Sequence, residues 1–149
     1  MIKRQTLLRT SLAAGLLLLA TVGCSQMQTS QSLVVYRATL NGAQEVPPAV
    51  TQGSGSAEVV FDSRTSTLSW TINHRGMTGP ATAAHFHGPA NPGQNAGVLV
   101  PIANINAQPV KGQVVITAQQ AGDLAAGRWY INIHSARYPG GEIRGQVVR

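Results

Sequence analysis

Gly, Pro and Asn residues divide the chain beyond Leu33 into short runs rich in Val, Ile and Thr, and no other feature limits the fold as strongly. The runs are six to nine residues long, which is the usual length of a β-strand. We expect strands at 33–40, 54–62, 67–75, 82–87, 97–102, 112–117, 128–134 and 142–148. The sequence therefore predicts an all-β fold: a single eight-stranded Greek-key sandwich or flattened barrel.

One segment departs from this pattern. Residues 118–126 are rich in Ala and Gln, which favours one or two turns of helix. Gly127 follows directly and is suited to end a helix, because glycine readily takes the left-handed conformation found there. We predict one short helix near 118–126.

Neighbouring side chains along a strand point to opposite faces of a sheet, so the expected strands divide their residues into two sets. The inward set contains Leu68, Trp70, Ile72, Phe86, Trp129, Ile131, Ile133, Ile143 and Val147. The outward set contains His85, His87, Tyr130, Asn132, His134, Glu142, Arg144 and Gln146. Glu142 and Arg144 lie two residues apart, and we expect them to form solvated surface pairs of little energetic weight.

Three of the four histidines belong to the outward set. His85 and His87 have Cα atoms ~6.7 Å apart on a strand, and imidazoles at that spacing can converge on one ion, since a metal–nitrogen bond is ~2 Å long. His134 on a neighbouring strand is the candidate third ligand, and three imidazoles with an open position suit copper or zinc. His74 falls on the other face, near a strand end, and is expected to be a hydrogen-bonded residue of the rim or core rather than a fourth ligand.

The same histidines have a purely structural interpretation. Imidazoles that bind no metal are expected to hydrogen-bond the loop around residues 89–97 and to hold its shape. Because histidine titrates near neutral pH, the order of that loop would then depend on pH around 6–7.

The N-terminal segment predicts export. Three cations in residues 1–9 precede an uncharged Leu/Ala-rich run at 10–23, which is too short for a comfortable membrane span and is typical of a signal peptide. The run ends in Ala-Thr-Val-Gly-Cys, which resembles a lipobox, so we predict a signal peptide at 1–23 and lipidation of Cys24. The polar residues 24–32 read as a tether. The expected location is the outer membrane or cell surface, with the lipid as membrane anchor.

Charge and motifs limit the classes of function. Eleven Lys and Arg against five Asp and Glu give a net charge of +6. The cations outside the leader are scattered rather than gathered on one face, so we expect no nucleic-acid partner. The sequence contains neither a nucleophile elbow nor a phosphate-binding loop, and it has no carboxylate pair at readable spacing.

Four segments, in order, resemble the chordin-like (CHRD) domain family. They are 36–48 (YRATLNGAQEVPP), 84–90 (AHFHGPA), 130–135 (YINIHS) and 139–146 (PGGEIRGQ). The resemblance covers 33–149, essentially the whole domain beyond the tether. Chordin is a secreted antagonist of bone-morphogenetic signalling, so the resemblance implies an exported interaction domain and names no reaction.

The order of a His-x-His pair, a late-strand histidine and a closing Gly-rich strand also resembles the copper/zinc superoxide dismutase sandwich. That resemblance implies that His85, His87 and His134 are copper ligands. The chain departs from the enzyme because no histidine lies between His87 and His134, both disulfide cysteines are missing, and only Arg137 is available to replace the active-site arginine. The resemblance therefore favours a copper-only site over the dismutase reaction.

Two functions remain open from the sequence. The first is a non-catalytic, lipid-anchored domain that binds a protein or an envelope polymer, and the sequence favours it. The second is a metalloprotein that binds copper or zinc through His85, His87 and His134. If the chain is an enzyme, we expect a copper-dependent oxidoreductase.

Overall fold

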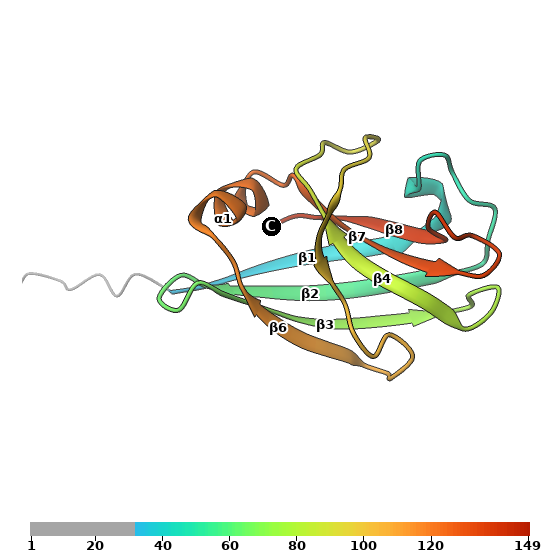
Figure 1. The fold of residues 1–149 in the computed structure, drawn as a ribbon, viewed down its shortest axis with the longest axis horizontal. Coiled ribbons are helices and arrows are strands. Elements are labelled where there is room, and N and C mark those ends of the chain that lie inside the picture. Colours follow the sequence, from blue (N-terminus) through green and yellow to red (C-terminus); the bar gives the residue numbers. More distant parts are fainter. Residues whose placement is uncertain (1–31) are drawn as a thin grey trace, which may run out of the picture.

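The structure, a computed structural model, describes residues 32–149 and forms an all-β domain with one short α-helix (Figure 1). The expected strands are all present, with ends that differ by at most two residues. They are β1 (Leu33–Asn41), β2 (Ser54–Asp62), β3 (Thr67–Arg75), β4 (Ala81–His87), β5 (Val98–Pro101), β6 (Val110–Val115), β7 (Trp129–Ser135) and β8 (Ile143–Val147). A 3-10 turn, η1 (Gly42–Gln44), follows β1.

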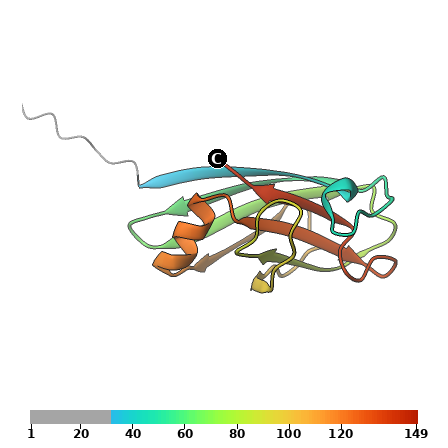
Figure 2. The same ribbon diagram turned by 90° about the horizontal axis from the view of Figure 1, so that it is seen from above.

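The eight strands form one antiparallel sheet in the order β5-β4-β7-β8-β1-β2-β3-β6. The sheet curls into a nearly closed, flattened barrel, with β5 and β6 as its two edges. Seen from above, its strands lie in two layers, with α1 at one end and η1 and the β7–β8 loop at the other (Figure 2). The chain crosses between the layers from β3 to β4, so β4 pairs with β7 and β5 rather than with β3.

The core lies between the two layers and confirms the inward set. Those nine residues are all buried, because each strand presents its apolar side chains to the interior. Phe86 on β4 lies edge-on to Trp70, with ring centroids 5.2 Å apart, and 6.0 Å from the Trp129 ring. The burial of Phe86 matters for the site, because it turns the neighbouring His85 and His87 to the opposite face of the sheet.

The short helix is confirmed as α1 (Ala118–Ala125). It begins with a capping box, in which the Thr117 side chain accepts a hydrogen bond from the Gln120 backbone and the Gln120 side chain accepts one from Thr117. Gly127, with a φ of 68°, lies just beyond its end. Leu124 packs into the core and attaches the helix to the barrel.

Candidate functional site: a three-histidine cluster

The structure brings together the three histidines that the sequence singled out. His85 and His87 lie on β4 and His134 lies on the adjacent strand β7. One ring nitrogen from each residue lies within 4.8 Å of the other two. The closest approach is between His85 Nδ1 and His134 Nε2, which are 3.1 Å apart. Three potential metal ligands therefore converge on one point of the sheet.

The cluster lies opposite the core, as expected, but its solvent exposure was predicted wrongly. His87 and His134 are only 8% and 9% exposed, and the neighbouring Asn132 is 3% exposed. The loops at 88–97 and 136–142 contribute the backbone carbonyls that these two histidines contact. Alternation along a strand assigns a residue to a face, but it does not show whether a loop covers that face.

Backbone carbonyls fix the orientation of two of the rings. His87 Nδ1 lies 3.0 Å from the Ala96 carbonyl oxygen, and His134 Nδ1 lies 2.9 Å from that of Pro139. A carbonyl oxygen only accepts hydrogen bonds, so each Nδ1 carries a hydrogen and donates it. In a neutral ring the Nε2 atom is then left with a free lone pair. The contact between His87 and Ala96 also bears out the expectation that a histidine holds the 89–97 loop.

The two Nε2 atoms face the side-chain amide of Asn132. Its Oδ1 lies 2.9 Å from His87 Nε2 and 3.0 Å from His134 Nε2. A neutral Nε2 has no hydrogen to give an oxygen, so beside neutral rings the amide turns its NH2 group toward the two Nε2 atoms. Nε2 is then the unprotonated nitrogen of His87 and His134.

The surroundings of His85 and His134 favour their neutral form. Burial lowers the pKa of His85, and the nearby His134 and His87 lower it further because two positive charges repel. Burial also lowers the pKa of His134, against the opposing effect of the Pro139 carbonyl. Neutral imidazole is the form that binds metal ions.

These shifts predict how the apo-domain responds to acid. A histidine whose pKa is lower in the folded state than in the unfolded state resists protonation, so its contribution is complete above pH 6.5 and declines as pH falls through that value. As pH falls from 7 to 5.5, we expect the wild type to lose free energy of unfolding relative to a variant without the three histidines, and the amides of residues 91–97 to exchange faster. Urea unfolding and hydrogen exchange measure both effects. A His85→Gln/His87→Gln/His134→Gln variant that retains the same slope would contradict this assignment.

Tyr130 and Arg144 extend the cluster. Alternation assigns both residues to the same face as the histidines, but it does not predict their contacts. The Tyr130 ring stacks on His87, with centroids 4.8 Å apart and planes inclined by 4°. The Arg144 guanidinium lies on Tyr130, with its carbon 3.5 Å from the ring centroid, as in a cation–π contact. The expectation of solvated surface pairs for Glu142 and Arg144 is wrong, because both side chains are buried. Arg144 donates hydrogen bonds to the carbonyl of Gln94 and the side chain of Asn95.

Glu45 is the second functional candidate that sequence reasoning missed, although it belongs to the Gln-Glu-Val-Pro-Pro motif. Its side chain is 5% exposed, and Oε1 has no hydrogen-bond partner. Burial raises its pKa to about 7, against the attraction of Arg144. The carboxyl group lies flat against Gly141, where an added Cβ atom would come within 2.3 Å of Oε1.

Glu45→Gln is expected to stabilise the domain above neutral pH. The folded state holds the Glu45 proton more tightly than the unfolded state, so the contribution of Glu45 to stability falls as pH rises from about 4.5 to 7. The neutral amide avoids that loss. One pKa unit corresponds to about 1.4 kcal/mol, and after allowance for Arg144 and for solvent at this position we expect a gain of about 1–2 kcal/mol at pH 8. Urea unfolding at pH 5 and pH 8 should show the gain only at the higher pH.

The fourth histidine and Arg137 lie outside the cluster. His74 Nε2 lies 2.8 Å from the Ile105 carbonyl oxygen, which confirms the expected hydrogen-bonded rim position. Arg137 lies over the Tyr138 ring at 5.7 Å. The predicted signal peptide and Cys24 lie outside the described residues. Within residues 32–149, no helix is long and apolar enough to cross a membrane.

The fold and the site together define a small all-β domain: an eight-stranded antiparallel barrel with three imidazoles on a face that loops cover. Comparison with family models assigns it further: the CHRD domain model matches residues 36–147, and the chain belongs to the CHRD domain family. The match runs from β1 to β8 and includes the whole histidine cluster. Neither curated proteins nor solved structures gave a match.

Proposed function

We propose that this CHRD domain binds one copper ion through His85 Nδ1, His87 Nε2 and His134 Nε2. The observation that carries the proposal is the convergence of one ring nitrogen from each histidine within 4.8 Å, combined with backbone carbonyls that hold Nδ1–H of His87 and His134. Metal-binding histidines characteristically donate their other ring nitrogen in this way, which fixes the free lone pair in the direction of the metal.

The donor set supports copper, with zinc as the competing ion. Three imidazoles without a carboxylate or thiolate in the cluster suit both metals, and copper(II) generally binds nitrogen sites more tightly than zinc. His85 is the least covered of the three, so a fourth position on its side is open to water or a small ligand. On binding, the contact between His85 and His134 is replaced by two bonds to the metal.

Metal analysis of protein purified without a histidine tag tests the proposal. We expect one copper per chain after exposure to copper(II) and removal of the excess, and no retained copper in the His85→Ala/His87→Ala/His134→Ala variant. His74→Gln is the matched control, because it removes a histidine that lies outside the cluster. Equal copper in the triple variant, or loss of copper in His74→Gln, would rule out this site.

We also propose that the domain acts outside the cytoplasm, attached to a membrane by a lipid on Cys24. The supporting observation is the sequence of residues 1–24, with its cationic start, apolar run and lipobox-like end. Cells supplied with labelled palmitate should incorporate it into the wild type but not into Cys24→Ala, and the variant should leave the membrane fraction. Labelling of Cys24→Ala would contradict the anchor.

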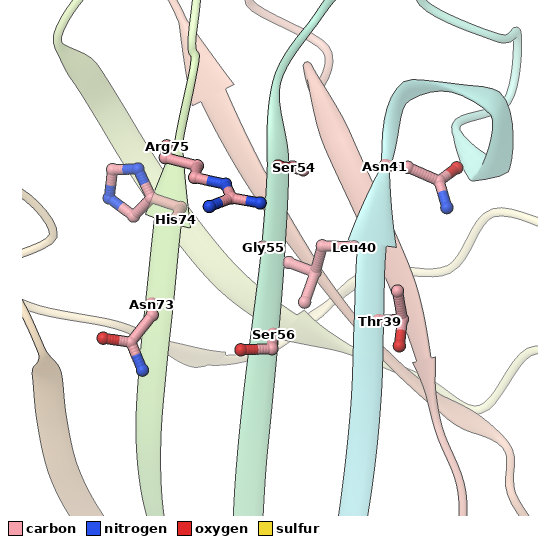
Figure 3. A pocket seen from close by; sticks show the side chains of 9 residues that line it. All are labelled: Thr39, Leu40, Asn41, Ser54, Gly55, Ser56, Asn73, His74 and Arg75. Atoms are coloured by element: carbon pink, nitrogen blue, oxygen red, sulfur yellow. The ribbon is translucent and has the colours of Figure 1, made fainter.

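A non-catalytic interaction module is the second candidate, and a pocket in the sheet favours it. Strands β1, β2 and β3 line a pocket of about 500 Å³ (Figure 3). Thr39, Ser56 and Asn73 are cross-strand partners in one row, and hydroxyl and amide groups of this kind suit a polar envelope polymer. Binding to isolated envelope polysaccharide that survives the triple alanine variant but is lost in Asn73→Ala would support this candidate. Absence of binding by the wild type would exclude it.

A further inference from the structure

A second pocket lies beside the histidine cluster, on the other side of the Tyr130 ring. Its volume is about 300 Å³, and Gln44, Glu45, Arg144 and Gln146 supply its polar groups. The remaining lining is largely apolar and comes from the segment after β1 and from the β4–β5 loop: Ala43, Val46, Pro48, Pro92 and Gly93. The Glu-Val-Pro-Pro motif thus provides both a carboxyl group and a wall of this pocket.

Arg144 is a buried cation that lacks an anionic partner. It is 1% exposed, yet it forms no salt bridge with a carboxylate in residues 32–149. Its hydrogen-bond acceptors, Asn95 Oδ1 at 3.0 Å and the Gln94 carbonyl at 2.7 Å, are both neutral. A buried charge is ordinarily paired with an opposite charge, and Arg144 still has N–H groups to donate.

Below about pH 7, Glu45 does not supply the missing negative charge. Its Oε1 atom has no partner although it is buried, and burial favours the protonated form of the group. Arg144 is the charged side chain that acts on it, while Gly141 and Val46, which also lie against it, carry no charge. The pocket therefore combines a cation with an unpaired carboxylic acid, which are two hydrogen-bond donors for one anion.

We propose that this pocket binds a small monocarboxylate, held between the guanidinium of Arg144 and the carboxyl group of Glu45. Arg144 donates N–H hydrogen bonds and balances the charge, and Glu45 donates its O–H to the second oxygen. The apolar lining from Val46, Pro48 and Pro92 receives a short alkyl group. This inference is independent of metal binding by the histidines.

Titration of the domain with propionate tests the proposal, with propionamide as the neutral molecule of the same shape. In NMR spectra at pH 6 we expect saturable shifts at Glu45, Gly93 and Arg144 with propionate and none with propionamide. Affinity should fall about tenfold between pH 6 and pH 8, because Glu45 loses its proton over that range. Equal shifts with propionamide, or no saturation with propionate, would overturn the proposal.

Three variants test whether propionate binds in this pocket and whether its binding is independent of the copper site. Glu45→Gln keeps a hydrogen-bond donor and should bind propionate with no pH dependence between pH 6 and 8. Ala43→Phe, at an exposed position in the lining, should block the pocket without unfolding the domain. His85→Ala, which removes a copper ligand whose hydrogen bond is to His134, should bind propionate as the wild type does while losing copper. Undiminished binding by a folded Ala43→Phe would place the carboxylate elsewhere and refute the assignment.

Discussion

Copper should raise the melting temperature of the domain by about 10 °C when its free concentration is one hundredfold above the dissociation constant. Binding to the folded state alone at that ratio adds about 2.7 kcal/mol to the free energy of unfolding, and a domain of this size gains roughly 4 °C per kcal/mol. The unfolded chain competes weakly, because His134 is 47 residues from His87 in sequence. Thermal unfolding followed by circular dichroism against copper concentration measures the shift.

Single variants show whether that shift belongs to the cluster. His87→Ala removes one of three ligands, and we expect it to abolish most of the shift, with copper affinity lowered at least about one hundredfold. Asn132→Ala should weaken binding less, since Asn132 contacts the Nε2 atoms of His87 and His134 but is not among the expected ligands. His74→Gln should retain the full shift. An undiminished shift in His87→Ala would contradict the proposed coordination.

The β-strands and core were predictable because local pattern alone determines them. Alternation in 128–134 places Trp129, Ile131 and Ile133 inside, and the same rule sets His134 on the opposite face. Phe86 does the same for its two histidine neighbours. The pairing of β4 with β7, which places His134 beside His85, is a tertiary feature that alternation does not reveal.

The sequence indicated a loop around residues 89–97 that contacts the histidines, but it did not show how the loops cover the site. The carbonyls of Ala96 and Pro139 orient two imidazoles. Because every residue has a backbone carbonyl, the residue type does not show which of them contacts a histidine. The loop around Asn95 likewise covers Arg144, which turns an expected surface cation into a buried one. The sequence did contain one indication that Glu45 is a functional candidate: in the Gln-Glu-Val-Pro-Pro motif it is an isolated acid among apolar and turn-forming residues.

Replacement of Glu142 by alanine should cost the domain about 3 kcal/mol or more in free energy of unfolding. Glu142 is fully buried, and its carboxylate accepts hydrogen bonds from Thr51 Oγ1 at 2.6 Å and from Thr78 N and Oγ1 at 2.8 Å each. It therefore ties the β1–β2 and β3–β4 connections to the start of β8. Alanine leaves these donors buried without an acceptor, and each such loss costs about 1–3 kcal/mol.

Because Glu142 ionises, its contribution to the free energy of unfolding is expected to depend on pH. Burial raises its pKa, but hydrogen bonds from Ser135, Thr51 and Thr78 together outweigh burial and lower the pKa below its ordinary value. A carboxyl group with a lowered pKa in the folded state stabilises the fold above the unfolded-state value near 4.5, and this contribution is lost as pH falls through the lower folded-state value. Acid unfolding of Glu142→Gln should therefore be less steep below pH 4.5 than that of the wild type.

Glu58 provides the matched control for Glu142. Its ion pair with Arg37 has a separation of 3.4 Å, and the two side chains are 55% and 73% exposed, so Glu58→Ala should change the free energy of unfolding by less than about 1 kcal/mol. Urea unfolding of the two variants at pH 7 compares a buried carboxylate with a solvated one in the same barrel. If Glu142→Ala proves no more costly than Glu58→Ala, the connections held by Thr51 and Thr78 do not depend on this carboxylate. The larger loss that we expect would instead identify Glu142 as the group that joins them to β8.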